Sequence, residues 1–361
     1  MKKFLLFIFI GFYSTNIYSQ VNTITDLGSK GMELVYNMQY NEAKNIFDEI
    51  IKIEPQSGYG YFLKSICYFW LFTDNKQNEK IKNEYESISF KAIDITEEML
   101  EKNEDNIDAM FYLGGIYGNL GRYYALDGSW IKAYWYGKKG KNFLEDVIEK
   151  DKNYYDAYVG LGIYHYYADE LPKLFKILSF ILGIEGDREL GLNELRLAIT
   201  NSKNTRTEAM IFLGSIYINF EKDFEKALPL FKEIYDKYPG NTDAGLSLGK
   251  CYWETGNYDL AKRQYQVLIN KFGNDKKYAS FYNTYGYMLL EKGFNEEAIE
   301  VFKKQVQVIP EQANPYDSLG DGYKKAGKIE LAIEEYNKAL KIDRDFKASK
   351  DKLEELNRRK K

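Results

Sequence analysis

Two consecutive blocks of 34 residues decide the fold: ASFYNTYGYMLLEKGFNEEAIEVFKKQVQVIPEQ, residues 279–312, and ANPYDSLGDGYKKAGKIELAIEEYNKALKIDRDF, residues 313–346. The two blocks abut without a gap and share small and aromatic residues at fixed positions. Numbered from one, each block has an aromatic residue at position 4 (Tyr282, Tyr316), glycine at 8 (Gly286, Gly320), alanine at 20 (Ala298, Ala332) and an aromatic residue at 24 (Phe302, Tyr336). A fixed period of this length is typical of a repeat protein built from one recurring unit.

The spacing has a physical reason if each block folds as two antiparallel helices. Glycine at position 8 and alanine at position 20 lie where the helices approach most closely, and larger side chains fill the space around them. Each hairpin then exposes an apolar face that the next hairpin covers. The pattern resembles the tetratricopeptide repeat, which implies an all-α fold, a solenoid wound as a right-handed superhelix.

The same frame extends upstream and predicts eight repeats. Blocks begin near Ile24, Thr207 and Thr242, and three more lie between residues 58 and 206. In repeats two, three and four the small residue of position 20 is Ala92, Gly140 and Gly191, respectively. Each lies between 14 and 17 residues beyond the place that an uninterrupted repeat would give it. We therefore expect helical insertions in these three repeats, and a final helix from Phe346 to about Arg358 that covers the last apolar face.

The N-terminal segment has the pattern of an export signal. Lys2 and Lys3 precede an apolar run from Phe4 to Phe12, which is too short to cross a bilayer as a helix. We expect cleavage near Ser19 and export to a periplasmic or extracellular location. The predicted organisation is a signal peptide (1–19), repeats with insertions (20–206), regular repeats (207–346), and a capping helix with a basic tail (347–361).

The insertion of repeat four is the stretch ELPKLFKILSFILGIEGDRELGL, residues 170–192, which is apolar on nearly every face. Its apolar part is too short to span a membrane. Groove positions of repeats two to five are also apolar: Phe62, Ile66, Phe69, Phe111, Val159, Ile163, Tyr166 and Ile211. We expect the insertions to fold back and bury this groove; a cavity for a lipid or other apolar ligand, and a contact with a membrane or partner, are the alternatives.

The stretch LPKLFKILSFILGIEGDRELGLNELRLA, residues 171–198, resembles a eukaryotic tetratricopeptide family linked to inclusion-body and lipid-droplet clearance. The likeness covers about residues 58–206 and is most specific at Gly186, Asp187 and Arg188. It implies a shared structural subtype, and Asp187 is well placed to cap the following helix.

Residues for catalysis or metal binding are few. His165 is the only histidine, and it takes a position where most repeats have tyrosine, which favours a role in the core. Gly322 to Ile329 fits half of a phosphate loop but lacks its serine or threonine and any preceding strand. Cys67 and Cys251 lie in distant repeats, so a bridge between them is not expected. We predict no catalytic residues, no metal and no cofactor.

An aromatic cluster with lysines lies in repeat three. It comprises Tyr123, Tyr124, Trp130, Tyr134, Trp135 and Tyr136, with Lys132, Lys138 and Lys139. Such a cluster could stack a sugar or bind an extended strand, but Trp130 and Tyr134, four residues apart on a helix, are more often packing partners.

The open groove is predicted in the last two repeats. Positions that line the concave face of this repeat type give Asn283, Tyr287, Glu291, Asp317, Asp321, Lys324 and Lys325. Mixed charge beside a tyrosine suits a protein or peptide partner. Removing Lys2 and Lys3 lowers the net charge from −4 to −6, which argues against a nucleic-acid partner. We therefore predict a non-catalytic interaction scaffold in the cell envelope; a protein that binds an apolar ligand or a membrane surface, and an unrecognised envelope enzyme, are the alternatives.

Overall fold

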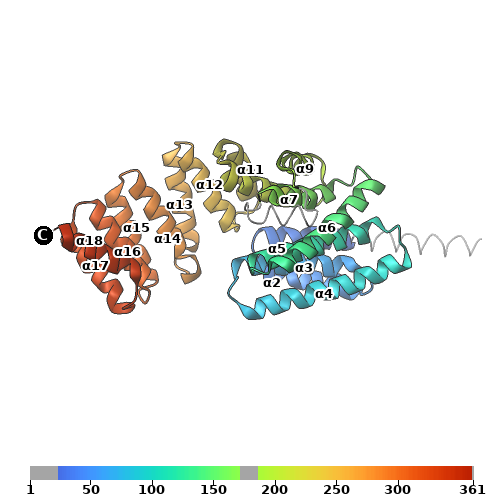
Figure 1. The fold of residues 1–361 in the computed structure, drawn as a ribbon, viewed down its shortest axis with the longest axis horizontal. Helices are drawn as coiled ribbons and strands as arrows, with labels where there is room; N and C mark the ends of the chain where they lie inside the picture. The colour runs from blue at the N-terminus through green and yellow to red at the C-terminus, as the bar shows by residue number, and fades with distance from the viewer. Residues whose placement is uncertain (1–22, 171–185, 360–361) are drawn as a thin grey trace, which may run out of the picture. The chain divides into compact units, whose positions relative to one another are not determined.

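The structure is a computed structural model that describes residues 23–170 and 186–359, and these residues form an all-α solenoid without strands. They divide into two compact units, one ending at Asn241 and one beginning at Thr242. The division predicted at residue 206/207 marks where the insertions end, whereas the boundary at 241/242 lies one repeat later and marks where contacts between helices are fewest. Figure 1 shows the helices following one another as antiparallel pairs.

The first unit is a run of helical hairpins in which each helix packs against the next one along the chain. A helix over residues 23–36 is followed by α2 (Tyr40–Ile53), α3 (Gly58–Asp74), α4 (Glu79–Lys102), α5 (Ile107–Leu126), α6 (Trp130–Lys150), α7 (Tyr158–Asp169), α9 (Arg188–Asn201), α10 (Arg206–Ile216) and α11 (Phe224–Lys237). A turn of π-helix, Tyr217–Glu221, follows α10 directly.

The second unit contains the regular repeats. Its helices are α12 (Thr242–Glu254), α13 (Tyr258–Phe272), α14 (Ser280–Glu291), α15 (Asn295–Val308), α16 (Ala313–Lys325), α17 (Ile329–Ile342) and α18 (Lys347–Arg359). The predicted final helix is α18, which packs on α17. Its Leu356 is buried with Ala332 and Tyr336, so it does cover the apolar face of the last repeat.

The close approach of paired helices explains the glycines of the repeat. A methyl group on Gly286 would lie 2.3 Å from the ring of Phe302, and one on Gly320 would lie 2.5 Å from the ring of Tyr336. The turns between the helices recur with the same period, because Gly293 and Gly327 both have positive φ (81° and 76°), which glycine adopts without strain. The 34-residue frame is therefore a packing requirement.

The insertions of repeats two and three differ from the prediction that they fold back over the groove. Their extra residues lengthen the hairpins themselves: α4 has 24 residues and α5 and α6 have 20 and 21, against 12 and 14 in α14 and α15. Each of these longer helices is unbroken over its length, and α5 and α6 pack against each other. The predicted insertion helix of repeat four falls largely on residues 171–185, outside the described residues.

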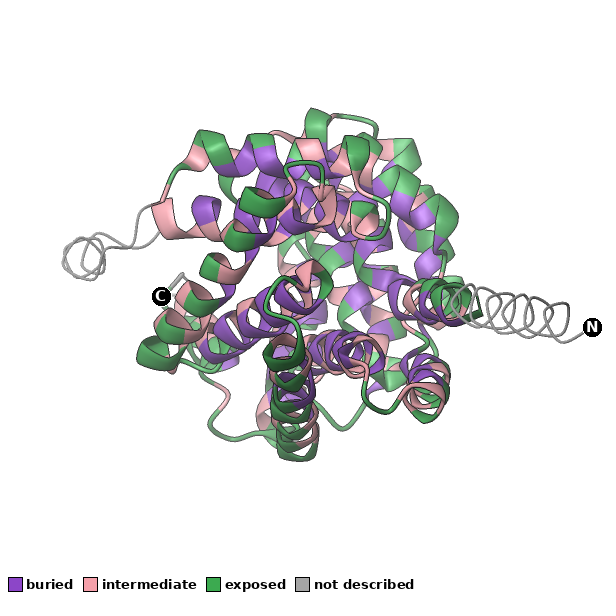
Figure 2. Cartoon of the chain, turned by 90° about the vertical axis from the view of Figure 1, so that its right-hand side faces the viewer, coloured by how far each residue is buried: buried purple, intermediate pink, exposed green. Residues whose placement is uncertain are grey.

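Seven of the eight apolar groove positions of the first unit are buried, and the eighth, Ile211, is half-buried. Phe62 stacks on Tyr112 with ring centroids 5.0 Å apart, and Trp70 of α3 lies 6.1 Å from Phe212 of α10. The Arg122 guanidinium lies between the rings of Phe69 and Phe212, 4.4 Å from each centroid. Side chains of successive first helices thus fill this interior, and Figure 2 shows buried residues along the helix sides that face neighbouring helices.

The two ends of the first unit meet. The Asn241 side-chain amide donates a hydrogen bond of 2.8 Å to the backbone oxygen of Tyr36, and the Gly240 N–H donates one of 2.7 Å to Asn37 Oδ1. The rings of Tyr36 and Tyr238 are 5.5 Å apart. Contacts between residues more than 200 positions apart close the concave side of this unit upon itself.

No helix among residues 23–170 and 186–359 is long and apolar enough to cross a membrane. The predicted signal peptide, residues 1–19, lies outside the described part of the chain.

Candidate functional site

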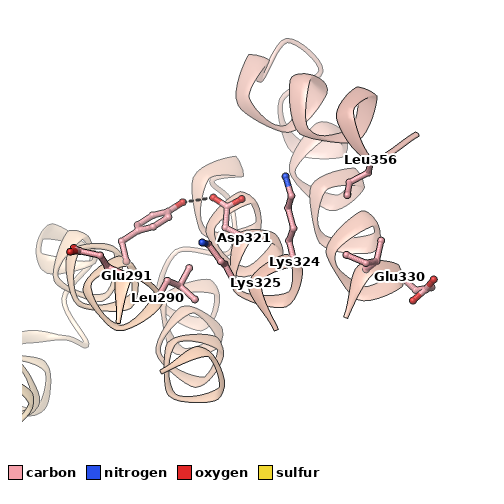
Figure 3. A pocket seen from close by; sticks show the side chains of 9 residues that line it. Leu290, Glu291, Asp321, Lys324, Lys325, Glu330 and Leu356 are labelled. Carbon is pink, nitrogen blue, oxygen red and sulfur yellow. Dashed lines mark hydrogen bonds between the residues drawn. The ribbon is translucent and has the colours of Figure 1, made fainter. Parts of the chain in front are cut away.

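A cavity of about 910 Å³ opens in the second unit, between the last turns of α14 and α16 and the helices α17 and α18. It is lined by Tyr287, Leu290, Glu291, Asp321, Lys324, Lys325, Ile329, Glu330 and Leu356. Five of the seven residues predicted for the groove are in this lining. Figure 3 shows the labelled side chains gathered around the cavity.

Asp321 is the centre of the polar network on one side of the cavity. Its carboxylate accepts hydrogen bonds from the hydroxyls of Tyr287 (2.7 Å, the dashed line in Figure 3) and Tyr336 (2.8 Å). Lys352 of α18 donates a third, at 2.7 Å. Burial, followed by the Asp321 carboxylate, raises the pKa of both tyrosine hydroxyls, so they stay protonated donors at neutral pH. This network fixes the Tyr287 side chain at the edge of the cavity.

The remaining charged groups of the lining are more accessible. Lys324 pairs with Glu355 of α18 at 2.7 Å. Glu291, Lys325 and Glu330 are exposed at the ends of α14 and α16 and the start of α17. Leu290, Ile329 and Leu356 provide an apolar floor. The cavity therefore offers an apolar surface surrounded by charges of both signs.

The other two predicted groove residues lie outside the cavity lining. Asp317 is only 3% exposed, and its carboxylate accepts hydrogen bonds from Ser349 (2.7 Å) and Lys352 (2.6 Å). Asn283 accepts a hydrogen bond from Ser318 at 2.7 Å. Each side chain joins two successive first helices. Asn283 joins α14 to α16, and Asp317 joins α16 to α18, which takes the place of the first helix of a ninth repeat.

Four lining residues were not in the predicted set. Leu290 stands at the same repeat position as Lys324, so the repeat frame alone could have identified it. Ile329 and Glu330 begin a second helix, and Leu356 belongs to the capping helix, whereas the prediction considered only first helices. The place of these three residues in the cavity lining depends on how the capping helix α18 packs.

His165 and the cysteines lie in the core. His165 Nδ1 is 2.7 Å from Glu194 Oε2, and both side chains are buried. Cys67 and Cys251 are free and buried, and desolvation raises the pKa of each thiol to about 12. The described residues contain no cluster of three or more potential metal ligands. In the phosphate-loop-like stretch, Gly322 lies within α16 and Ile329 begins α17, so no loop of that kind forms.

The Gly-Asp-Arg stretch has a structural role. Asp187 caps α9, since its side chain accepts a hydrogen bond of 2.9 Å from the Leu190 N–H, as predicted. Arg188 donates from Nε to Glu221 at 2.9 Å and also pairs with it through Nη2. Tyr166 donates to the same carboxylate at 2.5 Å. The stretch thus joins α7, α9 and the π-turn.

Comparison with known families identifies the repeat. Tetratricopeptide repeat models match residues 221–283, 279–312 and 313–346. The last two matches have the same bounds as the blocks read from the sequence, so the predicted frame is confirmed there.

Related proteins share this repeat over parts of their length. A TPR repeat-containing protein of Methanocaldococcus jannaschii is 24% identical over 327 residues, which are 91% of this chain and 44% of that protein. Superkiller protein 3 of Schizosaccharomyces pombe is 23% identical over 137 residues, 37% of this chain and 10% of that protein. The chain thus spans less than half the length of either relative.

Among solved structures, MamA from Desulfovibrio magneticus RS-1 is 21% identical, covers 48% of this chain and 96% of its own, and has a TM-score of 0.37. The specific resemblance of residues 58–206 to the clearance family stays a prediction. Tetratricopeptide repeat models thus match residues 221–346 of this chain.

Proposed function

We propose that this protein is an exported, non-catalytic scaffold that binds a segment of a partner protein in the cavity of its second unit. The observation that carries this proposal is the cavity itself. Its volume of about 910 Å³ could receive several side chains of a peptide, and its apolar floor lies beside charges of both signs. Burial of the partner's apolar side chains against Leu290 and Ile329 supplies affinity, and the exposed charges around the cavity select the partner.

The first unit is less suited to this role. Its concave side is occupied by its own aromatic side chains and closed by the contact of Tyr36 with Tyr238. The second unit therefore provides the surface on which a partner segment has room to bind.

The binding test uses peptides selected from a random display library on the immobilised protein, followed by titration calorimetry. The double variant Glu291→Lys, Lys325→Glu reverses two exposed rim charges without removing a buried contact. It should weaken binding of a charged selected peptide about tenfold or more. Tyr287 and Asp321 are less suitable targets, because their mutual hydrogen bond also supports the packing.

The matched control is Glu300→Lys, Lys304→Glu on α15, which reverses the same two charges on exposed residues outside the cavity lining. It should leave the affinity unchanged. Equal affinity of the rim variant and the native protein for charged selected peptides would overturn the proposed binding surface.

Export is supported by Lys2, Lys3 and the apolar run that follows them. N-terminal sequencing of the protein recovered from the periplasm or medium of an expressing bacterium should find a chain that begins close to residue 20. Recovery of the intact N-terminus from the cytoplasm would contradict this part of the proposal.

A further inference from the structure

The turn between α5 and α6 carries a cluster of exposed apolar side chains. Leu126 ends α5 and Trp130 begins α6, with Ile131 and Trp135 following on the same helix. Their exposed fractions are 50%, 49%, 77% and 61%. Among the twelve exposed large hydrophobic residues of the described chain, these four lie within ten positions. We call Leu126, Trp130, Ile131 and Trp135 the tip patch.

Packing between the helices explains why these residues face outward. A methyl group on Gly140 would lie 2.6 Å from the backbone nitrogen of Gly118, and one on Gly121 would lie 2.8 Å from that of Gly137. These glycines fix the face of α6 that contacts α5. With 3.6 residues per turn, Ile131 stands on the side opposite Gly140. The tip patch is thus outside the hairpin core.

The hairpin core instead takes the other aromatic residues of the predicted cluster. Tyr123 and Tyr124 are buried, and Tyr136 stacks on Tyr124 with ring centroids 5.3 Å apart. Trp135, although its ring is 5.1 Å from that of Tyr134, stays mostly exposed. The cluster read from the sequence therefore divides into a packed part and an outward part.

The charge beside the tip patch is positive, because the carboxylate of Asp127, in the turn between the two helices, is paired with Lys82 at 3.0 Å. Residues 130–142 contain four lysines and no carboxylate, although the whole chain has a net charge of −4. Lys139 and Lys141 pair with Glu97 and Glu145. Lys132 and Lys138 form no ion pair with the described residues. The Lys132 amine lies 4.6 Å from the Tyr124 ring centroid, and the Lys138 amine lies 3.3 Å from the Tyr134 hydroxyl. Two cationic groups thus lie next to the exposed apolar side chains.

We propose that the tip patch binds the surface of a lipid bilayer that carries anionic headgroups. Tryptophan rings favour the interface between headgroups and acyl chains, and isoleucine favours the outer acyl region. Lysine can keep its amine at the headgroup phosphates while its stem lies against apolar groups. Lysine is depleted from the cores of protein interfaces, which makes a protein partner the poorer fit for this combination.

The role of the lengthened hairpin follows from this inference. The extra turns of α5 and α6 place Leu126 and Trp130 at the end of the hairpin, beyond the length of a regular repeat. The binding is peripheral, because the patch extends over about two helical turns. This surface is separate from the cavity residues of the second unit, so the two proposals can fail independently.

The test is flotation of the purified protein, residues 20–361, with vesicles of phosphatidylcholine alone or mixed with phosphatidylglycerol. We expect binding to the mixed vesicles and little to phosphatidylcholine alone. The variant Ile131→Asp, Trp135→Asp should reduce the bound fraction about tenfold, since each carboxylate would have to enter the interface. The control Leu260→Asp, Val267→Asp, which changes two exposed apolar residues of α13, should bind like the native protein.

A second variant separates the charge from the apolar contact. Lys132→Gln, Lys138→Gln should weaken binding to the mixed vesicles and reduce its sensitivity to salt. Brominated acyl chains should quench tryptophan emission of the bound native protein. Failure to bind mixed vesicles, or binding that survives Ile131→Asp, Trp135→Asp, would overturn the proposal. So would a native dimer that this variant converts to a monomer, because a second copy would then cover the patch.

Discussion

At the scale of single residues, Arg122 links three repeats of the first unit. Its guanidinium contacts two aromatic rings and lies 3.7 Å from the Glu208 carboxylate. Arg122 Nε and Nη1 are buried without a hydrogen-bond partner among the described residues. A buried charge with incomplete hydrogen bonding costs desolvation energy that its partners must offset. Arg122 and Glu208 therefore depend strongly on each other.

Arg122→Ala should lower the free energy of opening of α5 and α10 by about 3 kcal/mol, because it leaves Glu208 buried without its cation. Hydrogen exchange resolved by peptide measures this change. Arg206→Ala, which removes an arginine from an exposed pair with Glu233, should cost under about 1 kcal/mol. Equal losses for the two variants would show that Arg122 has no special role.

Glu208 predicts a dependence of stability on pH. Burial raises the pKa of its carboxyl above the ordinary 4.5, although Arg122 opposes the shift. The folded state then keeps a proton that the unfolded state has released, so this contribution to stability is complete below about pH 4.5 and is lost as pH rises through the folded pKa. Glu208→Gln removes the titrating group.

The melting temperature of the native protein, relative to that of Glu208→Gln, should therefore rise as the pH is lowered from about 7 towards about 5. Thermal unfolding of both proteins in the same buffers gives the comparison. A difference that is constant across this range, or that falls on acidification, would contradict the raised pKa.

At the scale of elements, the α5–α6 hairpin depends on glycine where its two backbones touch. The helices could have been joined at the usual repeat length, but the small residues Gly118, Gly121 and Gly140 let them continue in close contact for about five turns. A long hairpin is stable only if every added turn packs on its partner. Glycine at the contact allows this at the cost of helix propensity.

Two glycines of α6 give a matched pair of substitutions. Gly140→Ala should destabilise the hairpin, because the new methyl group would meet backbone atoms of α5 at 2.6 and 2.9 Å. Gly137→Ala meets no atom within 4 Å, so it should stabilise the helix by about 0.5–1 kcal/mol through its better propensity. The two variants should shift the urea midpoint of unfolding in opposite directions. Shifts of the same sign would show that the backbone contact at Gly140 does not limit the stability of the hairpin.

At the scale of the whole molecule, the first unit is closed and the second has an open cavity. The pair Tyr36 and Asn241 joins the ends of the first unit, whereas Tyr287, Asp321 and Lys325 line a cavity. The same repeat therefore serves two purposes, packing upon itself in one unit and exposing a surface in the other.

The closure of the first unit can be tested by hydrogen exchange. Asn241→Ala leaves the backbone oxygen of Tyr36 without its side-chain donor, so exchange should accelerate at residues 23–36 and 234–241 together. The free energy of opening should fall by roughly 1–3 kcal/mol in both segments. Asn257→Ala, whose side chain bonds to Thr255 alone among residues 23–170 and 186–359, should leave both segments unchanged. Faster exchange at one end only would contradict a shared contact.

The sequence predicts local packing better than distant contacts. Gly286 and Phe302 are 16 positions apart in a recurring frame, so their contact could be predicted from spacing. Arg122 and Glu208 meet across 86 positions with no repeating signal, and the contact of Asn37 with Gly240 depends on the curvature accumulated over the whole unit. The cavity was predicted in part, because its first-helix residues follow the frame, while Leu356 enters through the packing of α18.

The central claim is that a partner segment binds in the cavity of the second unit. Its most direct test is the hydrogen-exchange footprint of a display-selected peptide on the full protein. Binding in the cavity should slow exchange at the last turns of α14 and α16 and the first turn of α17, and this footprint should be lost in Glu291→Lys, Lys325→Glu. Protection confined to the first unit, or to α13 and α15, with no change at α14 and α16, would contradict it.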